Sequence, residues 1–90
     1  MKIWVAQIEI SRAVESKIRT KHNLSGREVR EAIVGRSDIA AFMDLHPIHG
    51  QRIAIRAKSF DGNVLLAWLV PSNVELDVYR LVSARTENMR

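Results

Sequence analysis

The sequence predicts a single α+β domain over residues 1–90, with two N-terminal helices packed on one face of a largely antiparallel sheet. Three observations support this. The predicted elements run strand, helix, helix and then three strands, and grouping helices apart from strands is typical of α+β folds. The chain has 90 residues, 47% of them hydrophobic, which suits one small core. The segment 52–60 alternates apolar with basic residues, as a half-buried strand does.

The first two elements are a strand and a helix. Residues 2–10 are rich in strand formers, and Trp4 and Ile8 are expected on one face. Ser11 is a suitable N-cap for a helix that runs to about His22. Asn23 then breaks this helix.

The second helix has the clearest local signal. Ser25-Gly26-Arg27-Glu28 has the pattern of a capping box, in which the serine and glutamate side chains bond each other's backbone amides. Gly35 is a suitable stop. The next segment, 36–50, is ambiguous: residues 39–45 fit a third short helix or an irregular crossing segment, and Pro47 and Gly50 indicate a loop.

Three strands follow. The first, 52–60, is expected to place Ile53, Ile55 and Ala57 on one face. A turn at 61–63 leads to a strand over 64–70, which is apolar on both faces and therefore central. The last strand covers 76–84, and residues 86–90 form a frayed tail.

Composition excludes several classes of function. The chain has no cysteine, so disulfides, thiol nucleophiles and cysteine-based metal sites are excluded. Its longest strongly apolar run is too short for a membrane-spanning helix. We expect a cytoplasmic protein that uses no metal or cofactor and does not enter a membrane. The net charge of +4 permits an anionic partner such as nucleic acid.

The basic residues allow two interpretations. They form either a surface that binds phosphates or the solvated sides of amphipathic helices and strands. The candidate phosphate contacts are Arg52, Arg56 and Lys58 on a strand, with Lys17, Arg19 and Lys21 on the first helix. Arg80 is in phase with core-facing positions of the last strand, so it needs Glu9 or Asp77 as a partner, or a bulge that turns it outward.

The histidines and tryptophans also allow more than one role. His22 is the better candidate for a general acid or base, because the pKa of a histidine ordinarily lies near neutrality. The alternative interpretation, which is favoured for His22 taken alone, is an ordinary histidine at the end of a helix. His46 and His49 lie in a loop without further metal ligands nearby, so a metal site is not expected. Trp4 and Trp68 are expected in the core rather than as platforms for nucleobases.

Three stretches together resemble a known family. They are Ile8-Glu9-Ile10-Ser11 before a helix ending in Lys21-His22, then Leu24-Ser25-Gly26-Arg27-Glu28-Val29 with Glu31-Ala32, and finally Arg80-Leu81-Val82-Ser83-Ala84-Arg85. This pattern resembles the BrnT-type toxins of bacterial type II toxin–antitoxin systems, a branch of the RelE/ParE superfamily. The resemblance covers most of the chain. Asn23 replaces the usual glycine after Lys-His, Ile10-Ser11 replaces a Trp-Asp pair, and 36–50 does not match.

The resemblance implies a RelE/ParE-like fold and a metal-independent endoribonuclease that cuts messenger RNA, often on the ribosome. A cognate antitoxin would hold it inactive in a hetero-oligomer. Lys21, His22, Arg80 and Arg85 match the catalytic positions, and the basic residues of the strand and first helix would bind RNA. The alternatives are a non-catalytic module for nucleic acid or protein on the same fold, and a gyrase-directed toxin.

Overall fold

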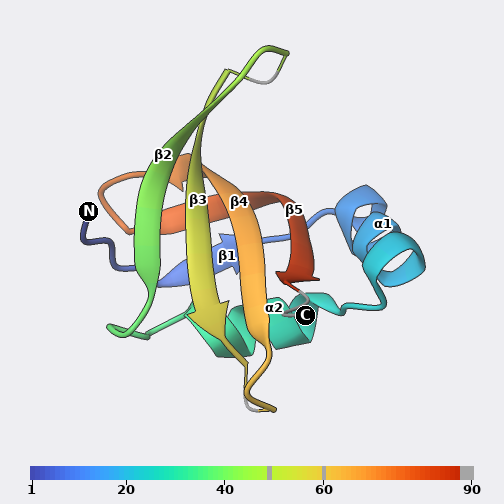
Figure 1. Ribbon diagram of the computed structural model, residues 1–90. Helices are drawn as coiled ribbons and strands as arrows, with labels where there is room; N and C mark the ends of the chain where they lie inside the picture. The colour runs from blue at the N-terminus through green and yellow to red at the C-terminus, as the bar shows by residue number, and fades with distance from the viewer. Residues whose placement is uncertain (49, 60, 88–90) are drawn as a thin grey trace.

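The computed structural model describes residues 1–48, 50–59 and 61–87. Two helices and five strands are present in this part of the chain (Figure 1). In chain order they are β1 (Gln7–Glu9), α1 (Arg12–His22), α2 (Gly26–Ile33), β2 (Ala40–His46), β3 (Gly50–Lys58), β4 (Val64–Asn73) and β5 (Val78–Glu87). The α+β class is therefore confirmed.

The five strands form one mixed sheet in the order β1-β5-β4-β3-β2. β1 pairs with β5 in parallel, and the other neighbours are antiparallel. β4 lies at the centre of this order, as its apolar character predicts.

The helices begin and end where the sequence indicates. Ser11 accepts a hydrogen bond from the amide of Val14, and Ser25 and Glu28 form the predicted capping box. Asn23 ends α1 in a left-handed conformation with φ 51°, which asparagine tolerates better than most residues.

The ambiguous segment holds a strand, so the third helix and the irregular crossing are both wrong. β2 pairs with β3 from Ala40 opposite Arg56 to His46 opposite Gly50. The local pattern is weak because Phe42 and Met43 are apolar neighbours and point to opposite faces. Pairing with β3, which lies later in the chain, decides the conformation.

Other boundaries differ from expectation at the ends of strands. β1 covers only Gln7–Glu9 of the predicted 2–10, and β5 runs on through Glu87 where a frayed tail was expected. Phe60 and residues 88–90 lie outside the described residues, as does His49. Trp4 is 49% exposed, so its assignment to the core is wrong.

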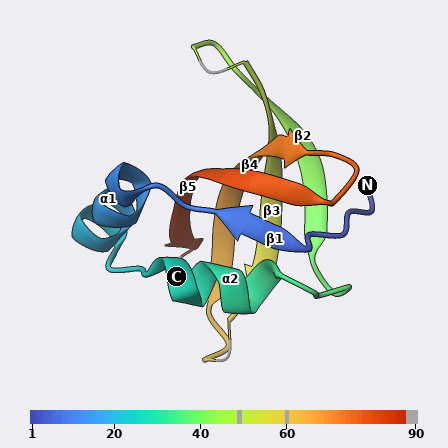
Figure 2. The same ribbon diagram turned by 180° about the vertical axis from the view of Figure 1, so that it is seen from behind.

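The helices and the sheet share one hydrophobic core. Val29 and Ile33 of α2 and Ile18 of α1 are fully buried in it, together with Ile55 and Leu69 of the sheet. α2 lies across the rear face of the sheet, and α1 lies beside β5 (Figure 2). None of the helices in the described residues is long and apolar enough to span a membrane.

No helix in the described residues covers the opposite face of the sheet, and we name it the open face. The alternation predicted for β3 is confirmed, because Ile53, Ile55 and Ala57 lie with the core. Strand register and burial place the following residues on the open face: Phe42, Asp44, Arg52, Ala54, Arg56, Lys58, Val64, Leu66, Trp68, Val70, Arg80, Ser83, Arg85 and Glu87.

Candidate nucleic-acid interface

A pocket of about 350 Å³ lies on the open face where β3, β4, β5 and the end of α1 meet. Its lining residues are His22, Arg52, Trp68, Ser83 and Arg85. Three of these, His22, Arg52 and Arg85, were predicted as site residues from the sequence. They come from segments far apart in the chain, and the sheet register brings them together.

His22 reaches the pocket because α1 stops there. It is the last residue of the helix, and the left-handed Asn23 reverses the chain directly after it. The amides of Asn23 and Leu24 donate to the carbonyls of Arg19 and Ile18, both at 3.1 Å, so the reversal is hydrogen-bonded. The imidazole is half-buried, and no hydrogen bond within the described residues engages it.

A β-bulge in β5 sets the direction of both predicted catalytic arginines. Trp68 opposes Ser83 while Leu69 opposes Leu81, so Val82 is the extra residue. In a regular strand Arg80 and Arg85 would lie on opposite faces, because their separation is odd. The bulge puts both on the open face, while Leu81 and Ala84 stay in the core.

Arg80 is therefore exposed and needs no buried partner. No ion pair joins it to Glu9 or Asp77 in the described chain. The Glu9 carboxylate instead accepts a hydrogen bond of 2.7 Å from the Ser72 hydroxyl. Of the two alternatives expected for Arg80, a carboxylate partner or a bulge, the bulge is the one observed.

Lys17 supports the bulge from outside the sheet. Its Nζ donates a hydrogen bond of 3.1 Å to the carbonyl oxygen of Val82. A bulged residue leaves the regular ladder, so its carbonyl needs another donor. Lys17 was predicted to bind RNA, and the structure gives its ammonium group this structural contact.

Trp68 lines the pocket, and two arginines lie over its ring. The guanidinium carbon of Arg52 lies 5.6 Å from the ring centroid, and that of Arg85 lies 5.5 Å from it. Both distances are within the range of cation–π attraction. Trp68 is half-buried on the open face, so it is not the core residue that the sequence suggested.

The two arginines differ in how far they are neutralised. Arg52 donates a 2.7 Å bond to Asp44, its side chain is only 12% exposed, and its Nε is buried without a partner in the described chain. Arg85 is exposed and pairs with no carboxylate in residues 1–48, 50–59 and 61–87. Arg85 is therefore the arginine of this pocket whose charge no carboxylate of the described residues neutralises.

The remaining predicted residues lie outside this pocket. Arg19 pairs with Glu15 within α1 at 3.0 Å, and Lys21 is exposed on the same helix. Arg56 pairs with Glu87 at 2.6 Å.

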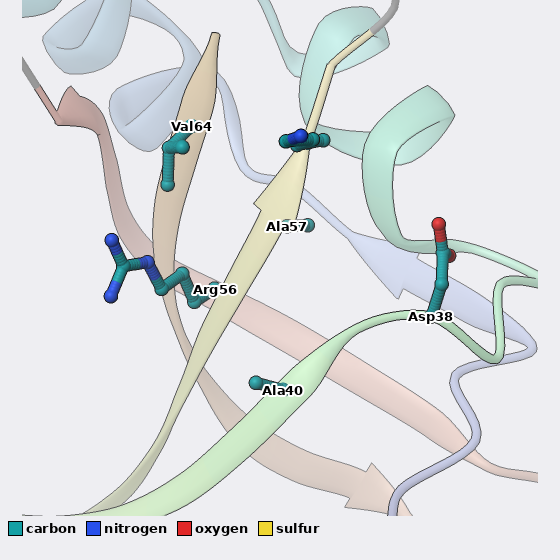
Figure 3. Close-up of a pocket in the computed structure, with 6 residues that line it drawn as sticks. Asp38, Ala40, Arg56, Ala57 and Val64 are labelled. Atoms are coloured by element: carbon teal, nitrogen blue, oxygen red, sulfur yellow. The ribbon is translucent and has the colours of Figure 1, made fainter. Parts of the chain in front are cut away.

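A second pocket, of about 310 Å³, lies at the far end of β3. It is lined by Asp38, Ala40, Arg56, Ala57, Lys58 and Val64 (Figure 3). Arg56 extends away from Asp38, which pairs with Arg36. This pairing lowers the pKa of the Asp38 carboxyl below its ordinary value, chiefly through the hydrogen bond from Arg36. The second pocket has no titratable group suited to acid–base chemistry near neutral pH, and the first pocket has His22.

Sequence reasoning missed Trp68 and Ser83 as site residues. Trp68 of β4 pairs with Ser83 of β5, at the position where the bulge shifts the register of the two strands. A tryptophan in an apolar strand is expected to be a core residue. Only the arrangement of the neighbouring strands shows that it lies on the open face. No cluster of three or more residues able to hold a metal occurs in the part of the chain that the structure describes.

Comparison of the chain with protein-family models, curated proteins and solved structures finds no match.

Proposed function

We propose that the protein is a metal-independent endoribonuclease of the BrnT-type toxin class, with a RelE/ParE-like fold and its active site at the His22–Arg85 pocket. The observation that supports this best is that one pocket on a basic face brings together His22, which has no hydrogen bond to the described residues, and Arg85, which pairs with none of their carboxylates. These are two of the four catalytic positions that the sequence resemblance indicates. We expect the toxin to act in the cytoplasm and to be held inactive by an antitoxin.

The chemistry needs only groups that this chain supplies. His22 accepts the proton of a ribose 2′-hydroxyl as that oxygen forms a bond to the adjacent phosphorus. The bond from phosphorus to the 5′-oxygen breaks, and the leaving oxygen takes a proton from solvent. The products are a 2′,3′-cyclic phosphate and a 5′-hydroxyl.

Arg85 stabilises the charge that develops on the phosphate oxygens, since its guanidinium is always ionised and binds two oxygens at once. Arg52 contributes from the other side of Trp68. Lys21 precedes His22 in α1, and Arg80 lies on β5 of the open face; neither lines the pocket, and both would hold neighbouring phosphates. Arg56 and Lys58 extend the positive charge along β3.

The test is incubation of the purified protein with a mixed-sequence RNA, with the ends of the products identified. We expect cyclic-phosphate ends, lost in His22→Ala and Arg85→Ala and retained in Lys2→Ala, which removes an exposed charge elsewhere. Expression in bacteria should arrest growth, and Arg85→Ala should relieve the arrest. Cleavage that persists in both pocket variants would refute the assigned roles.

A second function has one observation in its favour. Among the described residues, the pocket is lined by one histidine, His22, and by no carboxylate, so it supplies one acid–base group and not two. A non-catalytic RNA-binding module would need the arginines and no acid–base pair. Salt-sensitive binding without cleavage would support it, and growth arrest with intact RNA would instead indicate gyrase.

A further inference from the structure

A row of side chains crosses the open face through Trp68, which lines the pocket. Phe42, Ala54 and Trp68 are direct cross-strand partners on β2, β3 and β4. Partners in an antiparallel sheet point to the same face. The two aromatic residues therefore flank one small residue, with their strands about 10 Å apart.

The exposure of the three residues differs in an informative way. Ala54 is only 3% exposed although no helix covers this face, so its neighbours on the open face cover it. Phe42 is 49% exposed. An aromatic side chain of this size beside the pocket leaves half of its surface open to a ligand.

Positive charge surrounds this aromatic row. Arg52 and Arg56 flank Ala54 along β3, and Arg85 lies over Trp68 from β5. The open face carries five cations, namely Arg52, Arg56, Lys58, Arg80 and Arg85, against the carboxylates of Asp44 and Glu87. A ligand that matches this surface combines planar apolar groups with a repeated negative charge.

We propose that Phe42 and Trp68 form a stacking platform for unpaired bases of single-stranded RNA, with the arginines on the phosphates between the bases. This rests on the proposed function and deepens it, because it names the strandedness of the substrate and adds Phe42 to the binding surface. Bases in a duplex are stacked on each other and cannot reach a flat sheet face, whereas unpaired bases stack on aromatic rings and guanidinium planes.

The test measures binding without cleavage. The probe is a fluorescein-labelled 12-nucleotide 2′-O-methyl RNA of mixed sequence, which lacks the attacking hydroxyl, used single-stranded and annealed to its complement. Fluorescence anisotropy compares the wild type with Phe42→Leu, Phe42→Tyr and Arg85→Ala. Phe42→Leu keeps an apolar side chain and removes the ring, and Phe42→Tyr keeps the ring.

We expect Phe42→Leu to weaken single-strand binding about tenfold and Phe42→Tyr to bind as the wild type does. The salt dependence should stay unchanged in Phe42→Leu, because no phosphate contact is lost. It should fall by about 0.7 in log–log slope in Arg85→Ala. Because Phe42 is 49% exposed, Phe42→Leu and Phe42→Tyr should both keep the wild-type melting temperature.

A second readout follows the other ring. In a Trp4→Phe background Trp68 is the one tryptophan left, and its fluorescence should be quenched by the single strand and not by the duplex.

Wild-type affinity in Phe42→Leu, or an equal loss for duplex and single strand, would overturn the platform. Binding of a poly-glutamate peptide in place of the oligonucleotide would overturn it in favour of an acidic protein partner. If Phe42-dependent binding is found and unmodified RNA is not cut, the platform stands and the nuclease proposal fails. If RNA is cut in a way that depends on Arg85 and the Phe42 variants bind normally, the nuclease proposal stands and the platform fails.

Discussion

The bulge in β5 makes a specific prediction about Lys17, which sequence reasoning assigned to RNA and the structure assigns to the carbonyl of Val82. In Lys17→Met the aliphatic stem remains and the 3.1 Å hydrogen bond is lost. A hydrogen bond from a charged group contributes about 1.5–3 kcal/mol. Lys17 is half-buried, so solvent weakens the bond and replaces part of it. We expect a loss of about 1 kcal/mol in the free energy of unfolding.

For a domain of this size, 1 kcal/mol corresponds to about 4–8 °C in melting temperature. Thermal unfolding followed by circular dichroism measures this directly. Lys2→Met is the matched control, because it removes the same charge from an exposed residue and should leave the melting temperature unchanged.

The RNA-binding measurement separates the two roles of Lys17. If Lys17 supports the bulge, Lys17→Met should lower affinity for RNA while the slope of log affinity against log salt stays the same. If Lys17 contacts a phosphate, the slope should fall by about 0.7 and the melting temperature should not change. The second pattern would refute the structural role.

Three further predictions concern the two helices. The amide of Gly26 donates to the Glu15 carboxylate at 2.9 Å, and this bond is the main reason that the pKa of Glu15 lies below its ordinary value of 4.5, with Arg19 adding to it against the effect of burial. A lowered folded-state pKa stabilises the protein above the unfolded-state pKa, so Glu15→Gln should destabilise it at pH 7 and progressively less as the pH falls below about 4; equal differences at pH 3 and pH 7 would contradict this. Gly26→Ala places a methyl group 2.4 Å from the Glu15 carboxylate and 2.9 Å from the end of Ile10, and should cost about 1 kcal/mol in urea unfolding, because the carboxylate can move aside only by weakening its bond to the amide of residue 26. Asn23→Ala should cost about 1 kcal/mol because the residue is left-handed, whereas Asn23→Gly should change stability by less than about 0.5 kcal/mol; equal losses in both would contradict the conformational reason.

The fold was predictable where short-range signals decide the structure. The capping box at Ser25 and the cap at Ser11 act within one helical turn, and both are present as predicted. β2 was not predictable because its residues have no consistent alternation. Its conformation depends on the register with β3, which no local window contains.

The candidate site was predictable by residue type and not by geometry. His22, Arg52 and Arg85 were recognised because imidazole and guanidinium groups suit phosphate chemistry wherever they lie. The carboxylates that decide which cations stay available are set by the strand pairing and not by the local sequence: Arg56 is paired with Glu87 of β5, and Arg52 with Asp44 of β2. A count of basic residues therefore overstates the charge that this face offers a ligand.

The extra residue Val82 links the core of β5 to its chemistry. Leu81 and Ala84 are both buried, although an odd number of positions separates them, and only a bulge between them permits this. The same shift turns Arg80 and Arg85 to one face. One bulge therefore sets both the packing of the core and the direction of the arginines. A regular strand that kept Val82 in the ladder would have to bury either Arg85, with Ala84 exposed, or Arg80, with Leu81 exposed. Because a buried unpaired guanidinium is costly, the bulge at Val82 is the arrangement that keeps both arginines on the open face and both apolar residues in the core. The residues of the closing strand are therefore constrained by the site and the core together, and Lys17 holds the position at which the two meet.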